Sequence, residues 1–157
     1  MVKKIDSPQP KKADGSTRLT TSGSAHAPRE RYFEGIGRRK TAVARVRIVS
    51  GKGGILVNNK EAKAYFPMPA LQQIISSPLE NLKMADKFDI SAKLSGGGIH
   101  AQAEALRLGL SRALVLLNPD FKKKLRGLGF MTRDSRMVER KKYGLKKARR
   151  APQWQKR

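Results

Sequence analysis

The last seventeen residues of the chain, 141–157, cannot bury themselves in a hydrophobic core. They hold eight basic side chains and no acidic one, and the wider segment 122–157 supplies +13 of the chain's formal net charge of +23. Lys and Arg are almost never fully buried unless an acid pairs with them, and this segment has few acids. The segment therefore stays exposed or binds a strongly negative partner, and the compact part of the chain has to come from the residues before it.

Charge and composition divide the chain into three parts. The first 28 residues have a net charge of +3, few hydrophobic residues, and turn formers such as Pro8 and Gly15. Such a composition cannot bury enough apolar surface to fold alone. We expect a disordered or extended N-terminal extension at 1–31, a globular α/β domain at 32–128, and a basic extended C-terminal tail at 129–157.

Alternating hydrophobic residues predict strands in the middle part. Small or apolar residues occupy every second position from Ala42 to Ile48, which puts Arg45 and Arg47 together on the opposite face. The segment 51–54 is rich in glycine and predicts a turn. We expect strands near residues 32–49, 54–66 and 87–95.

Helical spacing appears between and after these strands. Apolar residues recur every three or four positions over 99–117, which is typical of a long amphipathic helix. A short helix is predicted over 69–75, and Ser-Pro-Leu-Glu at 77–80 has the pattern of a capping box that opens a second short helix. Asn-Pro-Asp at 118–120 ends the long helix and begins a short basic helix that ends near Gly127. Together these elements predict a compact two-layer α/β sandwich.

The motifs that commonly carry catalysis are absent or incomplete. Residues 35–41, Gly-Ile-Gly-Arg-Arg-Lys-Thr, have one residue between the glycines where a Walker phosphate loop needs four. The glycine triplet at 96–98 is either a tight strand-to-helix turn or a phosphate seat at a helix N-terminus. His100 has no cysteine or paired acid nearby, and Asp86 and Asp89 fit solvated turn positions. The sequence predicts no enzyme, no cofactor and no metal site.

The charge instead favours binding to nucleic acid. A protein with a pI near 11.1 associates with any polyanion that it meets. An anionic membrane is the alternative, but the sequence has no apolar run of about eighteen residues and its basic stretches lack an apolar face. The N-terminus lacks the apolar segment of a secretion signal, while an organelle transit peptide stays open.

Several groups of cations are suited to contacting phosphates. Arg38, Arg39 and Lys40 are consecutive, so an extended strand directs them to both sides of the backbone. Arg45 and Arg47 share a face that is either solvated or in contact with RNA, and the scarcity of acids favours RNA. A basic helix and the tail add further contacts. The predicted RNA-binding residues are Arg38, Arg39, Lys40, Arg45, Arg47, Lys122, Lys123, Lys124, Arg126, Arg133, Arg136, Arg140, Lys141, Lys142, Lys146, Lys147, Arg149 and Arg150.

Three stretches stand out together: GIGRRKTAVARV at 35–46, GGGIHAQAEALRLGLSRAL at 96–114 and GLGFMTRDSRMVERKKYGLKKARRAPQWQKR at 127–157. With the spacing between them, they resemble the universal small-subunit ribosomal protein nine family, in its bacterial type, over about 32–157. Residues 1–31 match nothing in the family core and form an extra N-terminal extension.

This resemblance implies a fold, a function and partners. Family members are similar to the ribosomal protein five domain-two-like fold, with a left-handed βαβ crossover. They are structural constituents of the small-subunit head, where they bind ribosomal RNA beside neighbouring ribosomal proteins, without a membrane or small-molecule partner. Their C-terminal tail extends to the peptidyl-site transfer RNA, a role that falls on Lys156 and Arg157 here. The implied location is the ribosome in the cytoplasm, with an organelle ribosome left open.

The end of the tail departs from the family pattern. Ala151 interrupts an arginine run, Trp154 replaces a phenylalanine and Gln155 replaces a serine, while the terminal Lys-Arg pair is kept. Tyr143 and Trp154 are candidates for stacking on exposed bases, and the alternative for Trp154 is packing against a protein neighbour or a proline.

Two other classes of function remain as alternatives. A nucleoid or RNA-chaperone protein would use its basic tails to condense nucleic acid without a fixed site, and it would need no ordered middle domain. A basic ribonuclease that depends on His100 is the third hypothesis.

Overall fold

The structure is a computed structural model that describes residues 31–156. The expected N-terminal extension falls almost entirely on residues 1–30, which lie outside the described residues, as does Arg157. In chain order the elements are β1 (Phe33–Arg39), β2 (Ala42–Ser50), β3 (Ile55–Val57), β4 (Lys60–Glu61), α1 (Ala62–Tyr65), α2 (Pro69–Asn81), β5 (Phe88–Ser95), α3 (Ile99–Leu117) and α4 (Phe121–Gly127).

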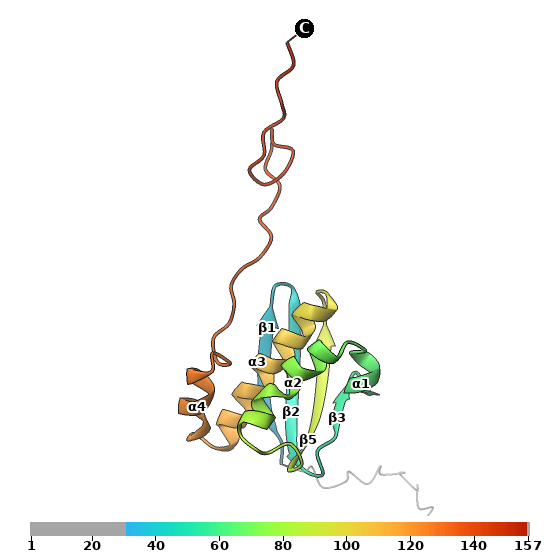
Figure 1. Cartoon of the computed structure of the whole chain (residues 1–157), viewed down its shortest axis with the longest axis vertical. Coiled ribbons are helices and arrows are strands. Elements are labelled where there is room, and N and C mark those ends of the chain that lie inside the picture. Colours follow the sequence, from blue (N-terminus) through green and yellow to red (C-terminus); the bar gives the residue numbers. More distant parts are fainter. Residues whose placement is uncertain (1–30, 157) are drawn as a thin grey trace, which may run out of the picture.

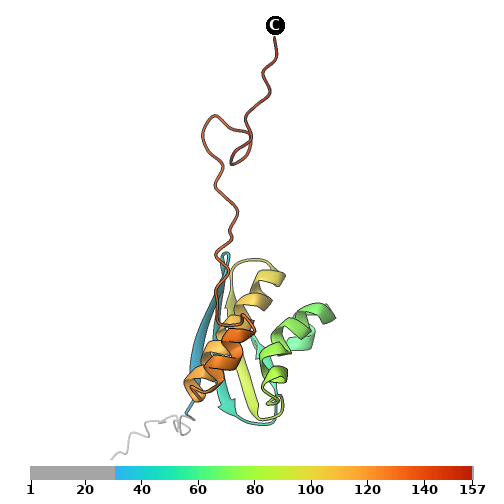
Figure 2. The same ribbon diagram turned by 60° about the vertical axis from the view of Figure 1, so that its left-hand side comes forward.

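The five strands form one mixed sheet with the order β1-β2-β5-β3-β4. The pairs β1–β2, β2–β5 and β3–β4 are antiparallel, whereas β3 and β5 are parallel neighbours. Helices α2 and α3 cover one face of this sheet (Figures 1 and 2). The predicted α/β architecture is therefore confirmed.

The crossover from β3 to β5 is left-handed. In Figure 1, β3 and β5 both run upward, α2 descends in front of the sheet, and the path moves from β3 on the right to β5 on its left. Most parallel crossovers have the opposite hand, because a right-twisted strand followed by a right-handed helix packs back onto the sheet in that sense. The implied left-handed unit is thus present in this chain.

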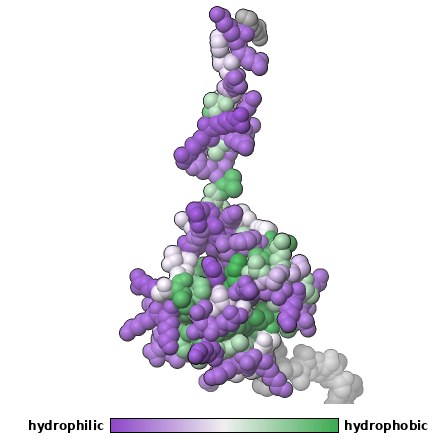
Figure 3. Space-filling model, in the orientation of Figure 1, coloured by the Kyte–Doolittle hydropathy of each residue, from purple (hydrophilic) through white to green (hydrophobic). Residues whose placement is uncertain are grey.

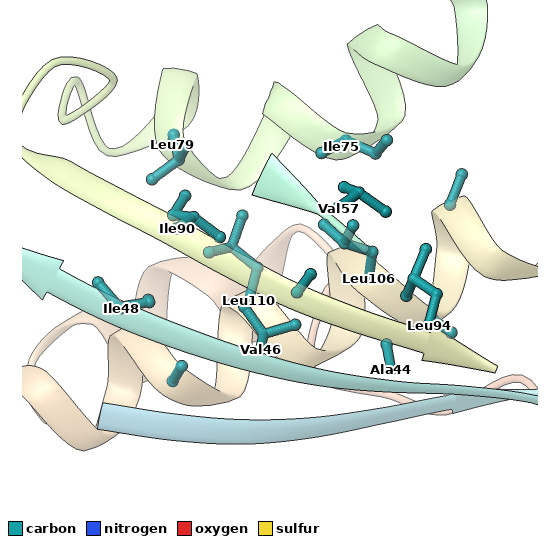
Figure 4. Packing of buried hydrophobic residues seen from close by; sticks show 14 of the residues in the cluster. Ala44, Val46, Ile48, Val57, Ile75, Leu79, Ile90, Leu94, Leu106 and Leu110 are labelled. Atoms are coloured by element: carbon teal, nitrogen blue, oxygen red, sulfur yellow. The ribbon is translucent and has the colours of Figure 1, made fainter. Parts of the chain in front are cut away.

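The core lies between the sheet and the two long helices. Inward-facing side chains of β2, β3 and β5 meet those of α2 and α3, as the labelled residues of Figure 4 illustrate. Burial alternates strictly along β5 and along the first seven residues of β2, as the period of two predicts. The helix predicted over 99–117 is confirmed at both ends, although Ile99 itself is exposed.

Glycines allow α3 to lie directly against β1. A Cβ on Gly37 would lie 1.8 Å from the carbonyl oxygen of Ala105, and one on Gly35 would lie 2.2 Å from that of Gly109. Only residues without a side chain permit this approach of a helix backbone to a strand backbone. The Gly-Ile-Gly motif therefore serves helix–sheet packing and does not form a phosphate loop.

The prediction of two short helices at 69–80 is wrong, because α2 is continuous and contains Pro78. A proline inside a helix removes a hydrogen bond to the carbonyl four residues earlier. Here the Ser77 hydroxyl donates to that carbonyl, on Ile74, at 2.9 Å. Glu80 accepts from the Ser76 hydroxyl, so the expected capping box does not form.

Two strand predictions also need correction. The region 32–49 is a hairpin of two strands, because Lys40 adopts φ of 50° and the chain reverses at Lys40–Thr41. The region 54–66 contains two short strands and then α1, which begins at Ala62. Within residues 31–156, no helix has the length and apolar character needed to cross a membrane.

Candidate nucleic-acid interface

The face of the sheet opposite α2 and α3 carries a group of cations, here called the open face. The pleat directs Arg45 and Arg47 of β2 to this side, while the alternate residues of β2 enter the core. Arg38 of β1 and Lys93 of β5 lie on the same side and are exposed. The structure therefore brings together three predicted RNA-binding residues and adds Lys93.

Glu34 organises the two arginines of β2. Its Oε1 accepts hydrogen bonds from Nε and Nη2 of Arg45 at 3.0 and 2.8 Å, and its Oε2 accepts one from Nε of Arg47 at 2.9 Å. These bonds, led by the one from Arg45, hold the pKa of Glu34 below its usual range. The Tyr32 ring lies 4.7 Å from the Arg47 guanidinium carbon, which further fixes that side chain.

A small hollow opens beside these arginines. Its volume is about 170 Å³, and Arg45, Arg47 and Lys93 bring three positive charges to its wall. Ser91 and Asn59 add hydroxyl and amide groups. Cations with spare N–H donors around a polar hollow are suited to a phosphate oxygen or the edge of a base.

Helix α4 presents a second basic surface. Lys122, Lys123, Lys124 and Arg126 are all exposed, while Leu125 between them is fully buried and anchors the helix on the body. Because none of these four cations has an ion pair within residues 31–156, their charge is available to a partner. The structure thus presents these predicted residues as one group.

Arg39 differs from its neighbours Arg38 and Lys40, which are exposed. The Arg39 side chain retains only 12% of its accessible surface and forms an ion pair with Glu104 of α3. It also contacts Asp134 Oδ2 at 2.8 Å and donates to the carbonyl oxygen of Arg136 at 2.7 Å. The positive charge of Arg39 is therefore paired with carboxylates of the protein itself.

Asp134 joins this group to the tail. Its carboxylate accepts side-chain hydrogen bonds from Arg136 at 2.8 and 3.1 Å. These bonds, with the Arg136 backbone N–H and the charge of Arg39, lower the pKa of Asp134 to about 2. The carboxylate is thus ionised at every pH near neutrality.

The tail leaves the body as a long projection without regular secondary structure over 133–156 (Figure 1). Hydrophilic residues dominate its surface in Figure 3. Its exposed cations are Arg133, Arg136, Arg140, Lys141, Lys142, Lys146, Lys147, Arg149, Arg150 and Lys156. Tyr143 and Trp154 are exposed too, and neither ring packs against the described body.

One part of the tail turns back on itself. The backbone N–H of Lys146 donates to the carbonyl oxygen of Arg150 at 2.8 Å, and Arg149 pairs with Glu139. Gly144, with φ of 76°, lies within this turn. The tail is therefore not extended throughout, and the length of a fully extended chain is an upper limit on its reach.

The glycine triplet before α3 forms a tight turn. Gly96 and Gly97 have φ of 69° and 67°, and a Cβ on Gly96 would lie 2.7 Å from the Thr41 carbonyl oxygen. This geometry supports the turn interpretation for these two residues. His100 lies in the first turn of α3 with Nδ1 3.7 Å from Glu104, and residues 31–156 contain no group of three side chains suited to a metal ion.

Four acidic residues that organise the structure were not anticipated from the sequence. Three are Glu34, Glu104 and Asp134, which pair with arginines predicted to bind RNA. The fourth is Asp89, whose Oδ1 accepts from three backbone N–H groups of the 51–54 turn at 3.0 to 3.1 Å, so it is not a free turn residue. The register of the β1–β2 hairpin, which places Glu34 opposite Arg47, is the signal that would have identified the ion pair between these two residues.

The comparisons with known proteins all indicate the same family. The family model described as ribosomal protein S9/S16 matches residues 37–157. The small ribosomal subunit protein uS9 of Cytophaga hutchinsonii is 57% identical over 122 residues, which cover 78% of this chain and 95% of the relative. Proteins of the same name from Mycobacterium avium and Mycolicibacterium paratuberculosis are 53% and 52% identical over 128 residues, covering 82% of this chain and 77% of each relative.

Proposed function

Because the chain belongs to the ribosomal protein S9/S16 family, we propose that it is a structural protein of the small ribosomal subunit and acts in translation by binding RNA. The observation that carries the proposal is the similarity to relatives named small ribosomal subunit protein, which extends over 95% of one relative's length. Exposed cations on the open face, on α4 and along the tail support it physically.

Ribosomal RNA is the proposed partner of the body. Lys122, Lys123, Lys124 and Arg126 on α4 would follow a phosphate backbone, as would Arg38 and Lys40 at the hairpin. Arg45 and Arg47 would offer the N–H groups that Glu34 leaves free. Contacts of this kind give affinity that falls steeply with salt.

The tail is the part that we propose to contact peptidyl-site transfer RNA. Its projection from the body and its cations would let it thread between RNA helices, with Lys156 and Arg157 at the anticodon stem-loop. Tyr143 and Trp154 have the exposure that stacking on a base requires. Neighbouring proteins of the subunit head complete the proposed surroundings, in a cytoplasmic or an organelle ribosome.

Deleting Gln155–Arg157 tests the role of the tail. We expect subunits to assemble normally and to retain less peptidyl-site transfer RNA, because two terminal cations are lost. The matched control is Lys122→Gln with Lys123→Gln, which removes the same charge from α4. We expect the control to bind ribosomal RNA more weakly, so that it assembles only at lower salt, and to retain transfer RNA normally. Normal retention together with defective assembly in the deletion variant would contradict this division.

Sedimentation of a cell lysate tests the wider proposal. Stable co-migration of the chain with small subunits through moderate salt supports a ribosomal protein. Dispersal among free nucleic acid would support the nucleoid or chaperone alternative instead, because a condensing protein has no fixed site.

A further inference from the structure

The point where the tail joins the body is held by contacts that converge from three elements. Arg39 at the end of β1 contacts Glu104 of α3, and it also contacts Asp134 and the Arg136 carbonyl of the tail. Just before these residues, the Phe130 ring lies 5.3 Å from the guanidinium carbon of Arg107 on α3. The segment 130–136 is thus fastened to the body at two places.

We infer that Arg39, with Glu104 and Asp134, forms a latch that sets the direction in which the tail leaves the body, and that Arg39 is a positioning residue and not an RNA contact. This inference rests on the proposed function for its biological meaning, because the latch aims the tail at its RNA partner. The physical claim concerns the free protein alone.

Charge balance separates the latch from the RNA-binding cations. Arg39 and Arg136 bring two positive charges, and Glu104 and Asp134 bring two negative ones, so the charges of these four paired side chains balance. A phosphate would compete with two carboxylates for Arg39, at a side chain that is only 12% exposed. The neighbouring Arg38 and Lys40 are exposed and unpaired among residues 31–156, and they suit RNA better.

The contacts are placed where they control orientation most strongly. Beyond Arg136, no hydrogen bond or ion pair in the described part of the tail reaches the body. The twenty residues from 137 to 156 span at most about 70 Å when extended, so a small rotation at the root moves the tip by many ångströms. The ion pairs of Arg39 with Glu104 and Asp134 are partly buried, and the benefit that we infer for this latch is a fixed exit angle of the tail.

The absence of cysteine from the chain allows a direct test in the full-length protein. Gln73→Cys on α2 and Val138→Cys, two residues beyond Arg136, provide two exposed sites for spin labels. Pulsed electron paramagnetic resonance then measures the distribution of distances between the body and the tail root. We expect a narrow distribution in the labelled parent, and loss of the narrow peak in Arg39→Gln.

The matched control is Arg38→Gln, which removes the same charge from the adjacent residue. In the free protein it should keep the narrow peak. Asp134→Asn should lose the narrow peak as well. Because Asp134 lies outside the sheet and helices, this variant replaces Arg39→Gln in the test if Arg39→Gln does not fold. A broad distribution in the parent, or a narrow peak kept in both latch variants, would overturn the inference. Equal broadening in Arg38→Gln would do so too.

A second measurement separates failure of the latch from failure of the proposed function. Small subunits that contain Arg39→Gln keep all tail cations, yet we expect them to retain less peptidyl-site transfer RNA. If deletion of Gln155–Arg157 leaves retention unchanged, the proposed tail function fails. The distance distributions of the free protein still decide whether the latch exists.

Discussion

Replacing Gly37 by alanine should destabilise the domain strongly, although the change adds only one methyl group. Gly37 faces α3 from the edge strand β1, and its φ is not in the left-handed region, so packing alone decides the effect. The new Cβ would lie 1.8 Å from the Ala105 carbonyl oxygen and 2.5 Å from the Gly109 nitrogen. Both obstacles are backbone atoms of a buried helix and cannot rotate away.

The size of the effect follows from the displacement that is required. Ordinary contacts begin near 3.4 Å, so α3 and β1 have to separate by about 1.6 Å at this point. Overpacked cores usually lose about 1–3 kcal/mol when side chains can adjust. Because a whole helix or strand has to move here, we expect a loss of about 3 kcal/mol or more, a large part of the roughly 5–15 kcal/mol that stabilises a typical domain.

Thermal and urea unfolding of the purified full-length chain measure this change. A loss of about 3 kcal/mol lowers the unfolding temperature by roughly 12–24 °C in a folded domain of about 100 residues. Gly127→Ala is the control, because a Cβ there meets nothing within 4 Å. Gly127 is the last residue of α4, so its replacement by alanine should raise the free energy of unfolding by up to about 1 kcal/mol, because the unfolded chain loses backbone freedom. Similar small effects of both substitutions would refute the argument that α3 and β1 are in backbone contact.

Two further predictions concern carboxylates. Glu34→Gln removes the acid that pairs with Arg45 and Arg47, so the affinity for RNA should rise. The plot of the logarithm of this affinity against the logarithm of the salt concentration should become steeper by about 1 in slope. Filter binding to ribosomal RNA at several salt concentrations measures the affinity. The control is Glu80→Gln on α2, which removes the same charge away from the open face. Equal gains in RNA affinity in both variants would contradict a local effect. Asp89 has a pKa below its ordinary value of 3.8, because the N–H groups of Gly54, Lys52 and Gly53 stabilise its charged form. Its contribution to stability is therefore present above about pH 4 and is lost as the pH falls through the folded pKa. Asp89→Ala should accordingly lower the unfolding temperature at pH 7. The difference in unfolding temperature from the parent should shrink towards pH 2. A constant difference would refute the charge-dependent part of this explanation.

The two surfaces proposed to bind RNA and the inferred latch use the same residue type for different purposes. Arg38 and Arg39 are adjacent, yet one is exposed and the other is enclosed by Glu104 and Asp134. The pleat separates them onto opposite faces of β1, and only the second face meets α3 and the root of the tail. Counting cations therefore overestimates the number available to RNA.

Some features of this protein follow from the sequence by itself, because they depend on local periodicity and composition. The alternation from Ala42 to Ile48 predicts which side of β2 is buried, and the spacing over 99–117 predicts α3 with both of its ends. The run of cations without an acid after residue 140 likewise identifies a segment that cannot enter a core. The three motif stretches were sufficient to indicate the family that the comparisons establish.

Other features were decided only by the tertiary structure, because they join residues that are distant in the chain. Arg39 and Glu104 are 65 residues apart, and no local pattern shows that one will face the other. Pro78 lies inside a helix because the Ser77 hydroxyl bonds to the Ile74 carbonyl and the surrounding core buries the ring, which outweighs the local signal for a helix start. Ion pairing depends on which elements meet in space, and that is why the sequence predicts the cations of the proposed interface but not the acids that pair with some of them.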